Sequence, residues 1–129
     1  MLNDPLAKVL NAVDTAEKLG KPEVRIGPSS KVITSVLQII QAKNLLGEFE
    51  LIENGRGGLY RIALTHKINR CGVIKPRFPV KVTEYELWEK KYLPAAGFGM
   101  LIVSTSQGMM AHREAKAKNL GGRLIAYVY

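Results

Sequence analysis

The sequence has few of the residues that build catalytic centres, disulfides and metal sites. Among its 129 residues there is one cysteine, Cys71, and there are two histidines, His66 and His112. A single cysteine cannot form an internal disulfide, and no second cysteine or paired histidine stands near it at the spacing of zinc ligands. We therefore expect Cys71 to be a small packing residue in a reducing cytoplasm, and we expect neither a metal nor a cofactor.

Long apolar runs and internal repeats are missing as well. No run approaches the ~20 apolar residues of a membrane-spanning helix, and the N-terminus lacks a charged region followed by an apolar stretch and a cleavage site. No period of about 20 to 50 residues recurs, which excludes a solenoid. We expect a cytoplasmic protein that is neither secreted nor membrane-spanning.

Negative charge is scarce. Nineteen Lys and Arg stand against eleven Asp and Glu, which gives a net charge of +8. An excess of this size attracts polyanions before any specific contact forms, although a basic composition also helps a protein stay soluble. Because the cations are spread over both halves of the chain, they indicate a folded basic surface and not a disordered arm. Nucleic acid is therefore the first partner to consider.

The first element is predicted to be an amphipathic helix. Apolar residues recur at three- and four-residue steps from Leu2 to Leu19. Asn3 is a candidate cap, Pro5 suits the first turn, and Gly20 is a typical stop signal.

An α-β-α-β-β lobe is predicted for residues 1–69. Its remaining elements are a strand over residues 23–26, a helix capped by Ser29 or Ser30 with an apolar stripe reaching Leu45, and strands over 49–53 and 59–65. The residues of the loop 54–58 tolerate positive φ, which favours a hairpin between the last two strands.

A second lobe, mostly β with short helices, is predicted for residues 70–129. Residues 67–79 lack helical periodicity and are punctuated by glycine and proline, which indicates a hinge or an irregular crossing. The predicted elements are a strand over 80–82, a helix over 84–92, a strand over 99–103, a helix over 109–118 and a strand over 124–129. The fold class expected for the whole chain is α+β, in two small packed lobes.

A segment rich in hydroxyl groups follows the apolar run 99–103. It consists of Ser104, Thr105, Ser106, Gln107 and Gly108. If a helix begins here, its unpaired backbone N–H groups can hold an electronegative group. Short side chains that donate and accept hydrogen bonds suit irregular RNA and its 2′-hydroxyl groups. Two interpretations stay open, a helix cap and an RNA contact.

Cations after this segment are candidates to hold phosphates: Arg113, Lys116, Lys118 and Arg123. Two rival functions are also considered. A small hydrolase or phosphate-binding enzyme would use the Ser106 region with His112, but the segment lacks a Gly-x-Ser-x-Gly elbow, and we expect His112 on a helix surface. A protein-interaction module would bind RNA only through its charge.

Long stretches of the chain resemble a known family. Residues 99–115 and 121–129 closely resemble the signature of the small-subunit ribosomal protein S8 family, and residues 4–7 and 30–33 begin the two helices as that family does. The segment 71–78 and the insertion around 85–94 are similar to the archaeal and eukaryotic branch.

This resemblance implies a non-enzymatic structural protein of the small ribosomal subunit. It implies binding to an irregular helix in the central domain of the small-subunit RNA, early in assembly and beside other small-subunit proteins. Ser104 to Gly108 match the family's main RNA-contact loop. Weaker candidates for RNA contact are Ser30, Lys31, Lys75, Arg77 and Phe78. Lys31 has the alternative of a solvated first-turn residue, and Phe78 that of core packing.

Overall fold

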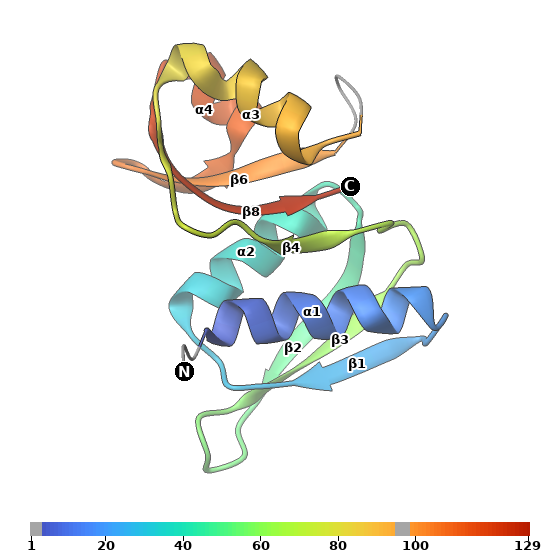
Figure 1. Ribbon diagram of the computed structural model, residues 1–129. Helices are drawn as coiled ribbons and strands as arrows, with labels where there is room; N and C mark the ends of the chain where they lie inside the picture. Colours follow the sequence, from blue (N-terminus) through green and yellow to red (C-terminus); the bar gives the residue numbers. More distant parts are fainter. Residues whose placement is uncertain (1–3, 95–98) are drawn as a thin grey trace. The chain divides into compact units, whose positions relative to one another are not determined.

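The structure, a computed structural model, describes residues 4–94 and 99–129 (Figure 1). Helices and strands combine into an α+β fold with two antiparallel sheets, which confirms the predicted fold class. The chain divides into two units, residues 1–71 and residues 72–129. Each unit has its own sheet, and the two are described in turn.

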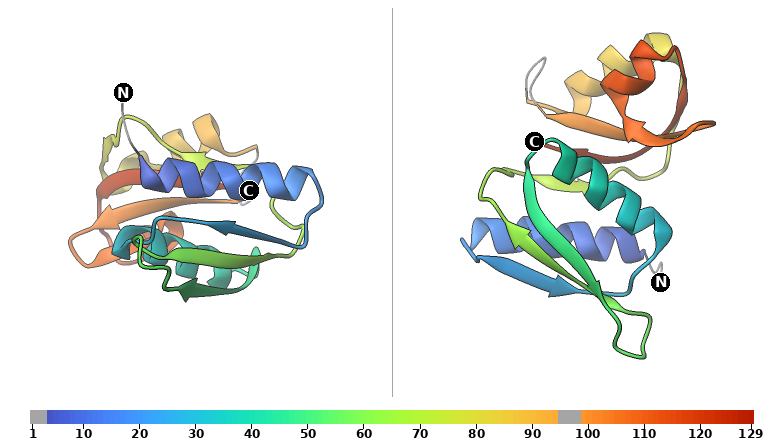
Figure 2. Two further views of the ribbon diagram at one scale, coloured as in Figure 1. Left: turned by 90° about the horizontal axis from the view of Figure 1, so that it is seen from below. Right: turned by 180° about the vertical axis from the view of Figure 1, so that it is seen from behind.

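The first unit has the predicted α-β-α-β-β order. Its elements are α1 (Pro5–Lys18), β1 (Glu23–Ile26), α2 (Lys31–Ala42), β2 (Leu46–Ile52) and β3 (Leu59–Leu64). The strands form an antiparallel sheet in the order β1-β3-β2. Helices α1 and α2 contact each other and cover one face of this sheet (Figure 2).

Side-chain caps set where the two helices begin. Asp4 caps α1 by accepting a hydrogen bond from the Ala7 N–H at 3.1 Å, so the predicted cap Asn3 is wrong. Ser30 caps α2 by accepting from the Ile33 N–H at 3.1 Å, as predicted. Helix α2 ends at Ala42, and Leu45 lies beyond it.

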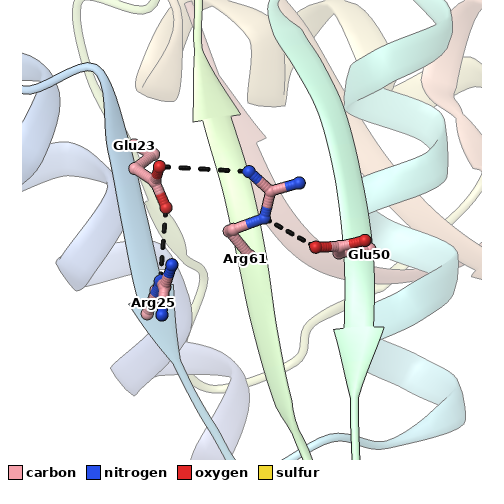
Figure 3. Close-up of polar contacts among 4 residues, drawn as sticks. All are labelled: Glu23, Arg25, Glu50 and Arg61. Atoms are coloured by element: carbon pink, nitrogen blue, oxygen red, sulfur yellow. Dashed lines mark hydrogen bonds and ion pairs between the residues drawn. The ribbon is translucent and has the colours of Figure 1, made fainter.

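The face of the sheet away from the helices carries charged side chains (Figure 3). Arg61 Nε donates to Glu50 Oε1 at 2.6 Å, and Arg61 Nη1 lies 4.0 Å from Glu23 Oε1. The hydrogen bond to Glu50 raises the pKa of Arg61 above its usual value. These groups are exposed, so solvent screens their attraction and the network contributes little stability.

The second unit contains a larger sheet and two helices on one face of it. Its elements are β4 (Cys71–Val73), β5 (Pro79–Val80), a 3-10 turn (Val82–Glu84), α3 (Tyr85–Tyr92), β6 (Met100–Thr105), β7 (Gly108–Ala111), α4 (His112–Ala117) and β8 (Gly122–Val128). The strand order is β4-β8-β6-β7, and β5 also pairs with β8. Tyr85 of α3 and Ala115 of α4 pack with Leu101, Val103 and Leu124 in its core.

Three segments of this half of the chain have a secondary structure other than the one predicted. Strand β4 lies in the segment 67–79 that we predicted to be irregular, and Val82 begins a 3-10 turn instead of continuing a strand. Strand β7 replaces the first part of the helix predicted over 109–118. Met109 and Met110 favour helices, but hydrogen bonding of β7 to β6 outweighs that weak local preference.

Candidate nucleic-acid interface

The hydroxyl-rich segment forms the turn of the β6–β7 hairpin. Thr105 pairs with Gly108 in antiparallel register, and Ser106 and Gln107 make the turn between them. The predicted helix N-terminus is therefore wrong, because α4 begins only at His112. The helix dipole cannot contribute to binding here, and any contact must come from the side chains and turn backbone.

Thr105 and Gly108 shape this turn. Thr105 Oγ1 donates to the Gly108 carbonyl at 2.7 Å and accepts from the Gln107 N–H at 3.1 Å. Gly108 has φ +108°, a conformation that glycine adopts without a steric penalty. Ser106 and Gln107 are exposed at the tip. The hydroxyl of Thr105 is thus used within the turn, while Ser106 beside it is exposed.

Arginines lie beside the hairpin in the sheet. The register pairs Ser104 with Arg123, and Arg123 with Pro79 on its other side. Arg123 Nη1 donates to the carbonyl of Arg77 at 3.4 Å, and both arginine residues are exposed. The fold therefore brings Arg77 and Arg123, candidates from separate parts of the sequence, next to the hydroxyl-rich hairpin.

Gly122 permits this close approach, and sequence reasoning missed it. A Cβ at Gly122 would overlap the backbone oxygen of Ser104 and lie 3.3 Å from Thr105 Cγ2. Neighbouring Gly121 is also confined, since its Cβ would lie 2.7 Å from the Val80 carbonyl oxygen. Two consecutive glycines at the start of β8 were the available signal of backbone crowding.

The other candidate RNA-contact residues of the second unit differ in burial. Phe78 is half-buried and stacks on Trp88 with ring centroids 4.8 Å apart, while its carbonyl accepts from the Leu124 N–H at 3.0 Å. Lys75 is exposed shortly before it, and Arg113 is exposed on α4. Phe78 therefore packs against the core of the second unit, as its core-packing alternative predicted.

Ser30 and Lys31 belong to the first unit. They line an open hollow of about 520 Å³ with Ser29, Thr34, Ser35 and Leu51. The Tyr60 hydroxyl donates to the Ser30 carbonyl at 3.0 Å, and Ser30 Oγ caps α2. Both residues are exposed, and Ser30 already has a structural role as the cap of α2.

His112 was predicted to lie on the surface, and it is fully buried. Its Nδ1 accepts from the Leu101 N–H at 3.0 Å, so the ring proton lies on Nε2, which donates to Glu89 Oε1 at 2.7 Å. Burial lowers the pKa of His112 below its ordinary value, although Glu89 acts in the opposite direction. Both ring nitrogens are occupied, so the hydrolase hypothesis lacks a base for Ser106.

The thiol of Cys71 is buried, which agrees with the predicted packing role. It donates to the Leu10 carbonyl at 3.3 Å, and burial raises the pKa of Cys71 to about 12. Because the thiolate is the nucleophile, this environment suppresses reactivity.

We expect thiol reagents to modify Cys71 far more slowly in the folded protein than in the unfolded chain. The smaller thiolate population alone should slow modification of the folded protein about 1,000-fold near neutral pH, because each unit of pKa changes that population tenfold. Mass spectrometry of iodoacetamide-treated protein, with and without urea, measures the two rates. Equal rates in both states would contradict the buried environment.

Over residues 4–94 and 99–129, no three His, Cys, Asp or Glu side chains gather closely enough to hold a metal ion. No helix within these ranges has both the length and the apolar character needed to cross a membrane.

Comparison with known families places the chain in a family of structural ribosomal proteins, which is not an enzyme family. The family model described as ribosomal protein S8 matches residues 4–129, nearly the whole chain. The chain therefore belongs to the ribosomal protein S8 family, as its sequence resemblance predicted. It is accordingly a ribosomal protein of the small subunit.

Proposed function

We propose that the protein binds an irregular helix in the central domain of the small-subunit RNA and promotes subunit assembly. The hairpin Ser104 to Gly108 is its main contact. The observation that carries this proposal is the exposed, hydroxyl-bearing turn beside Arg123 on the sheet of the second unit. Membership of a small-subunit ribosomal protein family supports the ribosomal context.

The residues of the hairpin have different roles in this proposal. Thr105 holds the turn through its two hydrogen bonds, and Gly108 supplies the required backbone conformation. Ser106 and Gln107 present groups that donate and accept hydrogen bonds, which match base edges and 2′-hydroxyls. Recognition then depends on a rigid turn whose exposed groups keep one arrangement.

Cations around the hairpin hold phosphates and set the register of the RNA. Arg123 pairs with Ser104 in the sheet, and its guanidinium donates to the Arg77 carbonyl. Lys75 and Arg113 extend this basic surface within the second unit, and Ser30 with Lys31 offers a contact in the first unit. Phosphate contacts of this kind position a protein without reading sequence.

Removing the hydroxyl of Ser106 tests the hairpin contact. We expect Ser106→Ala to weaken binding of a central-domain RNA fragment about fivefold, because one hydrogen bond contributes about 1 kcal/mol. Thr105→Val should weaken it further, since the turn itself loses two hydrogen bonds. Filter binding at physiological salt measures both, and Thr83→Ala is the control because Thr83 is exposed on another element of the same unit.

Competition with an unrelated duplex RNA separates specific recognition from attraction by charge alone. Specific binding retains its preference at physiological salt, whereas non-specific cationic binding weakens steeply with salt and prefers no RNA. If Ser106→Ala and Thr105→Val stay folded and bind like the wild type, the hairpin is not the contact. If the unrelated duplex competes equally well, the proposed RNA specificity is wrong.

A further inference from the structure

A row of stacked aromatic rings lies along the core of the second unit. Phe78, Trp88, Tyr92, Tyr127 and Tyr129 follow one another with centroid separations of 4.8, 6.2, 5.7 and 6.3 Å. Neighbouring planes differ by no more than 28° along the row. All five residues are half-buried and pack against the hydrophobic core from its edge. We call this group the aromatic row.

A single cation lies over three of these rings. Lys91 Nζ is 5.1 Å from the centroid of Trp88, 5.7 Å from that of Phe78 and 6.0 Å from that of Tyr92. Lys91 itself is exposed. An aromatic face beside a cation is the combination that holds an unstacked nucleotide, because the ring takes the base and the cation takes the phosphate.

Hydrogen bonds connect the Phe78 end of the row to the hairpin. The Leu124 N–H donates to the Phe78 carbonyl at 3.0 Å, and the preceding residue, Arg123, pairs with Ser104. Pro79 pairs with Arg123 on the other side. Two strand spacings of about 4.8 Å therefore separate the backbone beside Phe78 from Ser104, or about 10 Å in all. This separation is short enough for one RNA to span.

The size of the hairpin indicates that it needs a second contact. Even single nucleic-acid-binding modules bury about 600–1,000 Å² of protein surface. The tip of the hairpin exposes only Ser106, Gln107 and Gly108. These three small or medium residues cannot supply that area, so the RNA must also touch neighbouring surface.

We infer that Phe78 and Lys91 form a second RNA contact, in which an unpaired nucleobase of the bound RNA stacks on the Phe78 end of the aromatic row and Lys91 holds its phosphate. This inference rests on the proposed function, because the base belongs to the same RNA that the hairpin binds. Trp88, which lies directly against Phe78, stabilises the platform from behind.

Charge favours RNA over a protein partner at this surface. The acidic residues of α3 already have cationic or imidazole partners, Glu86 with Lys116 at 3.3 Å and Glu89 with His112 at 2.7 Å. Lys90 and Lys91 in the last turn of the helix, with the exposed Arg77 next to Phe78, leave the surface positive. A phosphate backbone complements that charge.

The first experiment compares two adjacent lysines. Lys91→Gln is expected to weaken binding of the central-domain RNA fragment at least threefold and to lower the slope of log affinity against log salt by about 1. Lys90→Gln makes the same charge change on the same helix turn, but no cation-π contact to a ring is seen for Lys90 within the described chain. It should change the affinity less than twofold. Equal effects of the two variants would overturn the assignment of Lys91.

The second experiment removes the ring and its ability to stack. Phe78→Leu is expected to weaken binding about 5- to 160-fold, as base stacking contributes about 1–3 kcal/mol, while Phe78→Tyr keeps most of the affinity. Deleting the unpaired nucleotides from the RNA should weaken wild-type binding similarly and make Phe78→Leu harmless. If Phe78→Leu does not fold, Trp88 fluorescence of the wild type still reports the contact, since Trp88 is the only tryptophan.

The results distinguish failure of this inference from failure of the proposed function. If the wild type binds the fragment and Ser106→Ala weakens binding, but RNA leaves Trp88 fluorescence unchanged and Lys91→Gln binds like Lys90→Gln, the second contact is wrong and the hairpin stands. If the wild type shows no preference for the fragment, both fail. A change in Trp88 fluorescence with selective loss in Lys91→Gln supports the inference.

Discussion

Gly122→Ala is expected to destabilise the protein by about 1–3 kcal/mol and to weaken RNA binding through the hairpin, as is usual when a tightly packed site receives an extra methyl group. The added Cβ would overlap the carbonyl oxygen of Ser104 and press on the Thr105 side chain. Backbone cannot move aside as a flexible side chain can. Strands β6 and β8 must separate there, and the hairpin must shift with them.

Urea unfolding followed by circular dichroism, together with RNA affinity, measures both effects. Gly20→Ala is the matched control, because a Cβ at Gly20 meets nothing within 4 Å and its φ of +71° leaves only backbone strain. That strain is worth about 1–2 kcal/mol and does not involve the hairpin. Gly20→Ala should leave the RNA affinity unchanged. If Gly122→Ala also leaves it unchanged, the close approach of Gly122 to Ser104 does not position the hairpin.

His112→Leu is expected to destabilise the protein by about 2–4 kcal/mol, since it leaves buried polar groups without a partner. The Leu101 N–H loses its acceptor and the Glu89 carboxylate loses its donor. These bonds join α4, β6 and α3 immediately after β7, so the hairpin loses support at one end. His66→Asn is the control, because His66 is exposed and asparagine tolerates its φ of 63°.

The same histidine makes stability depend on pH in a definite direction. The pKa of His112 is lowered in the folded protein from its ordinary value of 6.5, chiefly by burial. At a pH between the folded and the unfolded pKa of His112, the unfolded chain binds more protons than the folded protein does. Stability therefore decreases as the pH falls. The contribution of neutral His112 to the free energy of unfolding is fully present above about pH 6.5. It is lost as the pH falls through the pKa that His112 has in the folded protein. Urea unfolding across this range should show the loss in wild type and His66→Asn, and not in His112→Leu.

Much of the first unit could be predicted from local sequence because its signals are local. Apolar spacing identifies α1 and α2, and Ser30 caps a helix with its own side chain. The loop 54–58 was also predicted correctly: Asn54 Oδ1 accepts from the N–H groups of Arg56 and Gly58 at 2.8 and 2.9 Å. Each of these interactions joins residues only a few positions apart.

The second unit was harder to predict because its decisive contacts form between elements and are not visible in the local propensity of one segment. Met109 and Met110 become a strand only because β6 offers hydrogen-bonding groups beside them. His112 is buried because Glu89 and Leu101 satisfy its ring nitrogens. The composition of residues 109–118 favours a helix and does not indicate either contact, and helix propensity is too weak to resist strand pairing.

The sequence by itself determined the family, the basic character and the segment Ser104 to Gly108 as the candidate contact. It identified those residues through composition and a long family resemblance. Only the tertiary structure decided how they are presented, as a hairpin turn held by Thr105 and lined by Arg123 and Arg77. The physical reason is that a turn can be stabilised locally, whereas the neighbours of a strand are chosen by pairing between residues far apart in the chain.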